Sequence, residues 1–95
     1  STKEMARNLY QGEREDGFVS RNVGLLAMNL MLAAEERGWN THPMDGFEIE
    51  KVQKLFGLDE KYLPVVLIAI GKKPDDLKLF PRARRRPFEE VCEIR

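Results

Sequence analysis

The chain has 95 residues, and 16 Lys and Arg side chains balance 16 Asp and Glu side chains, so the formal net charge is zero. This length allows one small domain, and zero net charge argues against a protein whose whole surface binds nucleic acid or anionic membrane. A hydrophobic content of 42% argues against wholesale disorder, and no unbroken apolar run approaches the roughly 18 residues that a membrane span needs.

Residues 1–18 are polar. Apolar and small side chains recur at helical spacing until Gly12, which predicts a short helix followed by a charged loop at residues 13–17. The side chains at helical spacing are Met5, Ala6, Leu9 and Tyr10.

The clearest helix signal covers residues 21–37. Ser20 is a candidate N-cap, and Gly38 stands where a left-handed residue commonly ends a helix. Within residues 23–34 only two positions are not apolar, so apolar side chains point around the whole cylinder. A helix with one buried face would show polar residues every third or fourth position. We therefore expect this helix to be covered on most sides.

A loop with the sequence WNTHPMDG is predicted at residues 39–46. A second helix should follow at about residues 48–56 and end at Gly57. Residues 63–71 read LPVVLIAIG, and their unbroken, β-branched run at 65–70 predicts a strand buried on both faces.

The remainder of the chain, from residue 75, is interrupted by prolines and has no helical period before Phe88. We expect it to run extended over a surface, and residues 91–94 suit a short strand. The segment from residue 72 to 86 holds seven basic side chains against two acidic ones, a net charge of +5. Such a segment on a neutral chain favours a local anion site.

These elements need more covering material than the chain supplies. A doubly buried strand needs neighbours on both faces, and a helix that is apolar all round needs similar company. Three explanations stay open: an intimate oligomer, a fragment of a longer chain, or a split protein that another polypeptide completes.

Five segments carry a family resemblance through their order and spacing. They are LAAEERGW at the end of the long helix, the loop HPMDGF, the segment LFGLDEKYLP, the strand VVLIAIG and the ending RRRPFEEV. Together they resemble the C-terminal half of the FMN-dependent nitroreductase family, over residues 17–95. The resemblance implies an α+β, three-layer nitroreductase-like fold, of which residues 1–95 form one partial domain.

The resemblance also implies an assembly, because two chains of that family interlock to form two FMN sites at their interface. The family's N-terminal Arg-Ser-x-Arg segment is not found in this sequence. This departure implies a fragment, a processed product or an unusually short relative. We therefore expect a homodimer, or a complementing N-terminal half, as the partner.

The loop matching Pro43, Met44, Asp45 and Gly46 lies beside the flavin ring in the family, where backbone N–H groups approach N5 and O4. Gly46 would let the backbone come close to the ring. Many relatives carry Glu at the position of Asp45, so a backbone role is the more secure one. Taken alone, the segment is a good turn before a helix.

The resemblance further implies that Arg85 and Arg84 bind the FMN phosphate. Arg82 would stand in for a basic residue that relatives carry at the position of Ala83. Guanidinium groups suit phosphate because they stay charged and can bind it with two hydrogen bonds. The alternatives are a solvated basic tail and contact with nucleic acid through residues 82–86.

No side chain is expected to act as a catalytic nucleophile or to bind a metal. His42 is the only histidine and lacks Cys or Asp at ligand spacing, and Cys92 lacks a nearby base. The resemblance implies an oxidoreductase in which FMN accepts hydride from NADH or NADPH. Two electrons would then pass to a nitroaromatic, a quinone or a similar small molecule.

A non-enzymatic hypothesis competes with this one: a dimerisation or interaction remnant that keeps the apolar helix at residues 23–34. We expect neither nucleic acid nor membrane as a partner of the enzyme. The single cysteine, Cys92, and the lack of a visible signal peptide favour a reducing cytoplasm.

Overall fold

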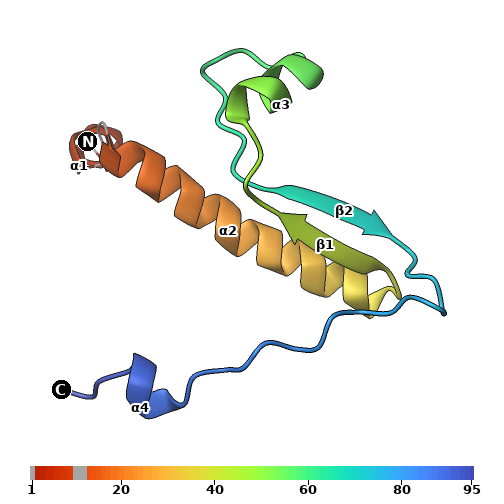
Figure 1. Cartoon of the computed structure of the whole chain (residues 1–95). Helices are drawn as coiled ribbons and strands as arrows, with labels where there is room; N and C mark the ends of the chain where they lie inside the picture. Colours follow the sequence, from red (N-terminus) through yellow and green to blue (C-terminus); the bar gives the residue numbers. More distant parts are fainter. Residues whose placement is uncertain (1, 10–12) are drawn as a thin grey trace.

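The computed structural model describes residues 2–9 and 13–95, and Figure 1 shows their arrangement. The elements in chain order are α1 (Thr2–Leu9), α2 (Glu13–Glu36), β1 (Asn40–Met44), α3 (Ile49–Leu55), β2 (Leu67–Gly71) and α4 (Phe88–Val91). Helices and one antiparallel sheet occur together, which confirms the predicted α+β class. The short helix predicted near the N-terminus is α1, whereas Tyr10 and Gly12 lie outside the described residues.

α2 is a continuous helix of 24 residues, and it begins earlier than predicted. The charged loop expected at residues 13–17 is wrong, because these residues form the first turns of α2. Ser20 lies inside the helix and does not cap it. Two physical reasons allow these residues to be helical. Acidic side chains in the first turn of a helix are stabilised by the positive end of the helix dipole. A single glycine within a helix, such as Gly17, destabilises it by only about 1 kcal/mol.

The end of α2 confirms the role predicted for Gly38. This glycine has a φ of 78°, in the left-handed region. Its N–H donates to the carbonyl of Glu35 at 2.9 Å, and the N–H of Trp39 donates to the carbonyl of Ala34 at 2.9 Å. Both hydrogen bonds belong to a Schellman motif, which satisfies carbonyl groups that a helix end leaves free. The chain therefore passes from α2 into β1 through one tight turn.

The two strands pair antiparallel, from Asn40 opposite Gly71 to Met44 opposite Leu67. The loop predicted at residues 39–46 is thus wrong over β1 (Figure 1). The sequence NTHPM does not predict a strand because it has no alternation of apolar and polar residues. These residues form a strand because they pair with β2. Pro43 is tolerated because both strands of a two-stranded sheet are edge strands.

The chain covers little of its apolar surface. Ala27 and Val52 are the only buried hydrophobic side chains among the described residues. Leu26 on α2 is 68% exposed and Ile70 on β2 is 51% exposed, so the predictions of a covered helix and of a doubly buried strand are wrong for this chain by itself. The predicted shortage of covering material is confirmed.

α3 follows Glu48 and is followed by Gly57, with a φ of 63°, as predicted. Beyond Gly71 the chain runs extended away from the sheet until α4, and Figure 1 shows this tail separate from α3. The strand predicted at residues 91–94 is wrong, because Val91 ends α4 and the N–H of Cys92 donates to the carbonyl of Phe88 at 2.8 Å. Every side chain from residue 72 onward is exposed.

α2 is long and apolar enough, by length and composition alone, to cross a membrane over Arg14–Glu36. This finding corrects the expectation that no segment meets that criterion, since the window tolerates isolated charges within the apolar stretch. The core helix of a globular protein passes the same test, so one such helix does not assign a membrane protein.

Candidate functional site

The predicted flavin loop lies at the end of the sheet that points toward α3. Pro43 pairs with Ile68, and Met44 pairs with Leu67 at the last position of the ladder. Asp45 and Gly46 follow in the turn before α3. The two strands therefore fix the backbone that enters this turn.

Gly46 makes the turn possible and leaves its backbone accessible. Its φ is 75°, a conformation that costs residues with a Cβ about 1–2 kcal/mol. A Cβ built at this position would meet nothing within 4 Å, so the space beside the backbone is open. An adjacent hollow of about 320 Å³ is lined by Gly46, Phe47, Glu48, Lys51, Val52 and Leu55. A flat ring could approach the chain here without a backbone rearrangement.

The side chain of Asp45 accepts a hydrogen bond from the next backbone N–H in the turn. The N–H of Gly46 donates to Oδ1 of Asp45 at 2.7 Å. This contact stabilises the turn through a side chain, a common use of Asp in turns. The side chain is exposed, so a χ1 rotation into solvent would free the Gly46 N–H for a ligand.

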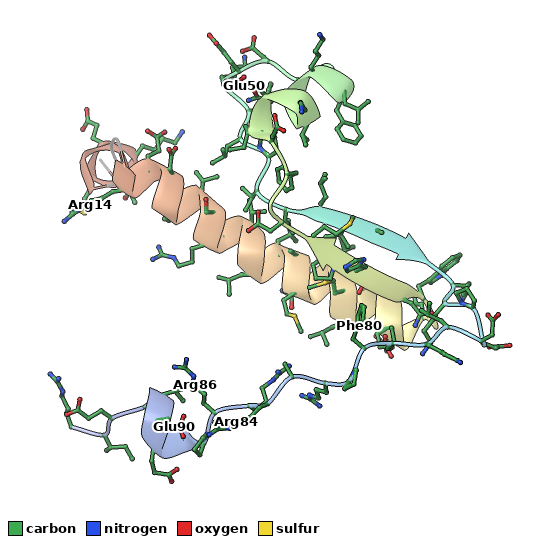
Figure 2. All side chains as sticks on the ribbon, in the orientation of Figure 1. Arg14, Glu50, Phe80, Arg84, Arg86 and Glu90 are labelled. Atoms are coloured by element: carbon green, nitrogen blue, oxygen red, sulfur yellow. The ribbon has the colours of Figure 1, made fainter. Side chains whose placement is uncertain are left out.

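The predicted phosphate-binding arginines lie on the extended tail before α4. Arg84 pairs with Glu90 at 3.0 Å, and Arg85 donates to the carbonyl of Ala83 at 3.0 Å. Figure 2 shows Arg84 and Arg86 on this tail, with Glu90 beside Arg84 on α4. The side chain of Arg84 is 76% exposed, and Arg82 and Arg85 are exposed as well. These guanidinium groups remain accessible to an anion.

The structure does not bring the loop and the arginines into contact. Figure 1 shows the tail at residues 82–86 well separated from the turn between β1 and α3. No hydrogen bond or ion pair joins the two groups among the described residues. Within one copy of the chain, the loop and the arginines therefore form two separate groups of candidate site residues.

A third feature, missed by the sequence analysis, lies where the tail leaves β2. The ammonium group of Lys72 donates to the carbonyl of Gly38 and lies 4.3 Å from the centroid of the Trp39 ring. The N–H of Lys73 donates to Oδ1 of Asn40 at 2.7 Å. The sequence showed these lysines only as charges, because their partners lie more than 30 positions earlier and become visible only with the strand register.

Two hollows flank this feature. One, of about 390 Å³, lies between the end of α2, Trp39 and Ile70. The other, of about 580 Å³, is lined by both strands, by Glu35 and by the start of the tail. Within the described part of the chain, no group of three His, Cys, Asp or Glu side chains is placed to hold a metal ion.

The family model described as "Nitroreductase family" matches residues 2–72. The protein MhqN of Bacillus subtilis, provisionally named an NAD(P)H nitroreductase, is 41% identical over 73 residues, covering 77% of this chain and 35% of its own length.

Solved structures agree with this likeness. A nitroreductase family protein from Streptococcus pneumoniae superposes with a TM-score of 0.80 at 29% identity, over 100% of this chain and 46% of its own. A protein from Exiguobacterium sibiricum, described as a nitroreductase and solved in complex with FMN, gives a TM-score of 0.80 at 29% identity, over 99% of this chain and 43% of its own. The chain thus has the nitroreductase fold and spans less than half the length of these relatives.

Proposed function

Because the chain belongs to the nitroreductase family, we propose that it provides part of the flavin site of an FMN-dependent NAD(P)H oxidoreductase. The match over residues 2–72 carries this proposal, and it includes the loop at Pro43–Gly46. A further support is that the relative from Exiguobacterium sibiricum was solved in complex with FMN. FMN has a flat ring at one end and a phosphate at the other, which are the groups that the loop and the arginines would bind.

At the loop, the chain would bind and orient the ring. The open space beside Gly46 permits close approach of the backbone. Asp45 would release the Gly46 N–H, which could then donate to an acceptor atom on the ring. A fixed N–H aimed at atoms whose charge changes during a reaction needs no reorganisation at that moment. The strand pairing ends at Met44, two residues before this N–H, and so fixes where the turn begins.

At the tail, Arg84 and Arg85 would bind the phosphate, with Arg82 as an additional donor. These guanidinium groups are exposed, and a guanidinium group can bind a phosphate through two parallel hydrogen bonds. Arg84 would exchange its exposed ion pair with Glu90 for the phosphate, and such a surface pair holds it by only about 0–1 kcal/mol.

Bound FMN would supply the redox chemistry, accepting hydride from NADH or NADPH and passing two electrons to a nitroaromatic, a quinone or a similar acceptor. No nucleophilic side chain is required of the chain. The lone cysteine and the family together support a cytoplasmic location as part of this proposal.

The exposed apolar face of α2 supports an assembly as the active form. Leu25, Leu26 and Leu32 are between 56% and 68% exposed. Contiguous exposed apolar surface of this kind marks an interaction site. We propose a second copy of the chain as the partner, by analogy with interlocked family dimers.

A flavin titration tests the proposed function. The purified chain should quench FMN fluorescence in a saturable way and shift the visible flavin spectrum. Gly46→Ala should alter both effects, since a Cβ at a left-handed position next to the ring displaces the backbone. Gly57→Ala is the matched control, because Gly57 has a similar φ of 63° but lies after α3. An unchanged FMN spectrum with the native chain would count against the proposal.

The second candidate function is an interaction module without activity. The exposed apolar face of α2 favours it, because that face needs a partner whether or not flavin binds. A chain that self-associates yet neither binds FMN nor supports FMN-dependent NADH or NADPH oxidation would be such a module.

A further inference from the structure

The contacts where the tail leaves β2 form a clasp, made by Gly38, Trp39 and Asn40 on one side and Lys72 and Lys73 on the other. Two consecutive lysines contact three consecutive residues that lie 33 and 34 positions earlier. The clasp closes the end of the sheet, because Asn40 and Gly71 are its last pair there. It is the point from which the tail begins.

Each clasp contact has a physical basis. Lys72 brings a positive charge to the end of α2, where free carbonyl groups carry partial negative charge. Its ammonium group also lies over the Trp39 ring at 4.3 Å, within the range of a cation–π interaction. Asn40 accepts from the backbone N–H of Lys73, so it orients the main chain of the tail directly. A two-stranded sheet is marginally stable by itself, so contacts at its end restrict fraying.

The clasp sets the direction in which the backbone leaves the sheet, and local features of the tail limit how far that direction can change. The N–H of Leu77 donates to the carbonyl of Pro74 at 3.2 Å, which forms a turn directly after the clasp. Pro74, Pro81 and Pro87 each fix their own φ near −65°, which limits the backbone conformations open to the tail between the clasp and α4. The arginines lie between Pro81 and Pro87, so the orientation of the tail at its origin determines where they are held.

We propose that Asn40 and Lys72 are positioning residues for the phosphate-binding arginines: by clasping the origin of the tail, they hold Arg84 and Arg85 at a fixed place relative to the loop at Gly46. This proposal rests on the proposed FMN function for its ligand, whereas the clasp itself rests on geometry. Neither residue contacts the ligand under this proposal. Each lowers the cost of ordering the tail when the phosphate binds.

Energy transfer within the native chain tests the clasp without any flavin. The chain has a single tryptophan, Trp39, in the clasp and a single cysteine, the exposed Cys92, beyond the arginines. A fluorescent acceptor on Cys92 allows time-resolved transfer from Trp39 to report the distribution of distances between clasp and tail. Donor-only samples of each variant correct for changes in tryptophan lifetime.

The native chain should give one narrow distance distribution. Asn40→Ala and Lys72→Met should each broaden it, whereas Asn40→Asp, which keeps the acceptor oxygen, should retain the narrow one. Lys78→Met is the matched control, because Lys78 lies on the same tail outside the clasp and should leave the distribution narrow. A broad distribution in the native chain, or no broadening in either clasp variant, would overturn the proposal.

Hydrogen exchange in the native chain tests the clasp without any substitution, so the result does not depend on whether a variant folds. The amide of Lys73 should exchange more slowly than the amide of Lys78, because only the former donates to Asn40. Equal, rapid exchange at the two amides would show that the clasp does not hold the tail in solution, and would overturn the proposal.

Comparison of FMN with riboflavin separates this proposal from the proposed function, since riboflavin lacks the phosphate. Asn40→Ala and Lys72→Met should weaken FMN binding about tenfold, because only a fraction of the freed tails is oriented for binding, and should leave riboflavin binding unchanged. A native preference for FMN that persists in both variants would refute the positioning role and leave the proposed function intact. A native chain that binds neither flavin would refute the proposed function, and with it the positioning role.

Discussion

Two regions of this chain differ in what holds them. The first, the helix–sheet unit, comprises α2, β1 and β2, and its parts contact one another through a Schellman turn, a strand ladder and the clasp. The second, the part of the tail beyond the clasp, comprises residues 74–95, and its hydrogen bonds and ion pairs are local ones such as that between Arg84 and Glu90. The loop is therefore positioned by the fold, whereas the arginines are positioned through one attachment point.

The largest expected effect is on the tail. Replacing Arg84 and Arg85 together by Ala should lower FMN affinity by at least about a hundredfold, because each charge-assisted hydrogen bond contributes roughly 1.5–3 kcal/mol. Helix content should not change, since both side chains are exposed. Fluorescence titration with FMN and circular dichroism measure the two quantities.

The matched control for this pair is Arg86→Ala, which removes a neighbouring charge from the same tail. It should change FMN affinity by less than about threefold, the scale of a screened surface charge. Equal losses from Arg85→Ala and Arg86→Ala would indicate a diffuse electrostatic effect in place of a phosphate site.

The second prediction concerns the helix–sheet unit. Gly38→Val should destabilise it by about 1–3 kcal/mol, because a β-branched residue is strained at a φ of 78°. Its Cβ would lie 3.5 Å from the ammonium nitrogen of Lys72, an ordinary contact, so the expected cost comes from the backbone conformation. Urea unfolding followed by circular dichroism measures the change.

Gly24→Ala is the control for that substitution, since Gly24 lies within α2 and a Cβ there meets nothing within 4 Å. It should stabilise the helix by about 0.5–1 kcal/mol. A Gly38→Val chain as stable as the native one would contradict the role of the turn between α2 and β1.

The third prediction concerns the apolar face of α2. Leu26→Gln should weaken self-association about tenfold, because a fully buried leucine contributes about 1.5–3 kcal/mol at an interface. Sedimentation velocity over a concentration series measures it. Leu55→Gln is the matched control: Leu55 on α3 is also exposed, at 78% against 68% for Leu26. If both variants weaken association equally, α2 is not the specific interface.

The smallest effect should come from the ion pair within the tail. Glu90→Gln should change the free energy of unfolding by less than about 1 kcal/mol, as expected for an exposed pair. Because it frees Arg84, it should raise FMN affinity slightly, whereas Glu89→Gln should not. Weaker FMN binding in Glu90→Gln would show that Glu90 orients Arg84 toward the phosphate.

Much of the fold could be predicted where local chemistry decides the structure. Gly38 and Gly57 were identified as helix ends, and both adopt the positive φ that only glycine takes readily. The apolar run before Gly71 was identified as a strand, and β2 forms there. The likeness to nitroreductases was visible in the order of five segments, and the family match confirms it.

The failures occur where distant residues decide the structure. β1 has a loop-like sequence and becomes a strand because β2 offers hydrogen-bonding partners. The acidic start of α2 resembles a loop and becomes helical because the following apolar helix extends it. The clasp was not predicted, since its contacts join residues more than 30 positions apart. The loop at Pro43–Gly46 and the arginines at positions 82, 84 and 85 keep their predicted roles as proposals.

A crystal structure of the chain with FMN would show where the flavin binds. The flavin ring should lie beside Pro43–Gly46, with the Gly46 N–H turned from Asp45 to the ring. Guanidinium nitrogens of Arg84 and Arg85 should lie about 2.7–2.9 Å from phosphate oxygens. A flavin bound elsewhere, or a phosphate without an arginine contact, would contradict the proposed site.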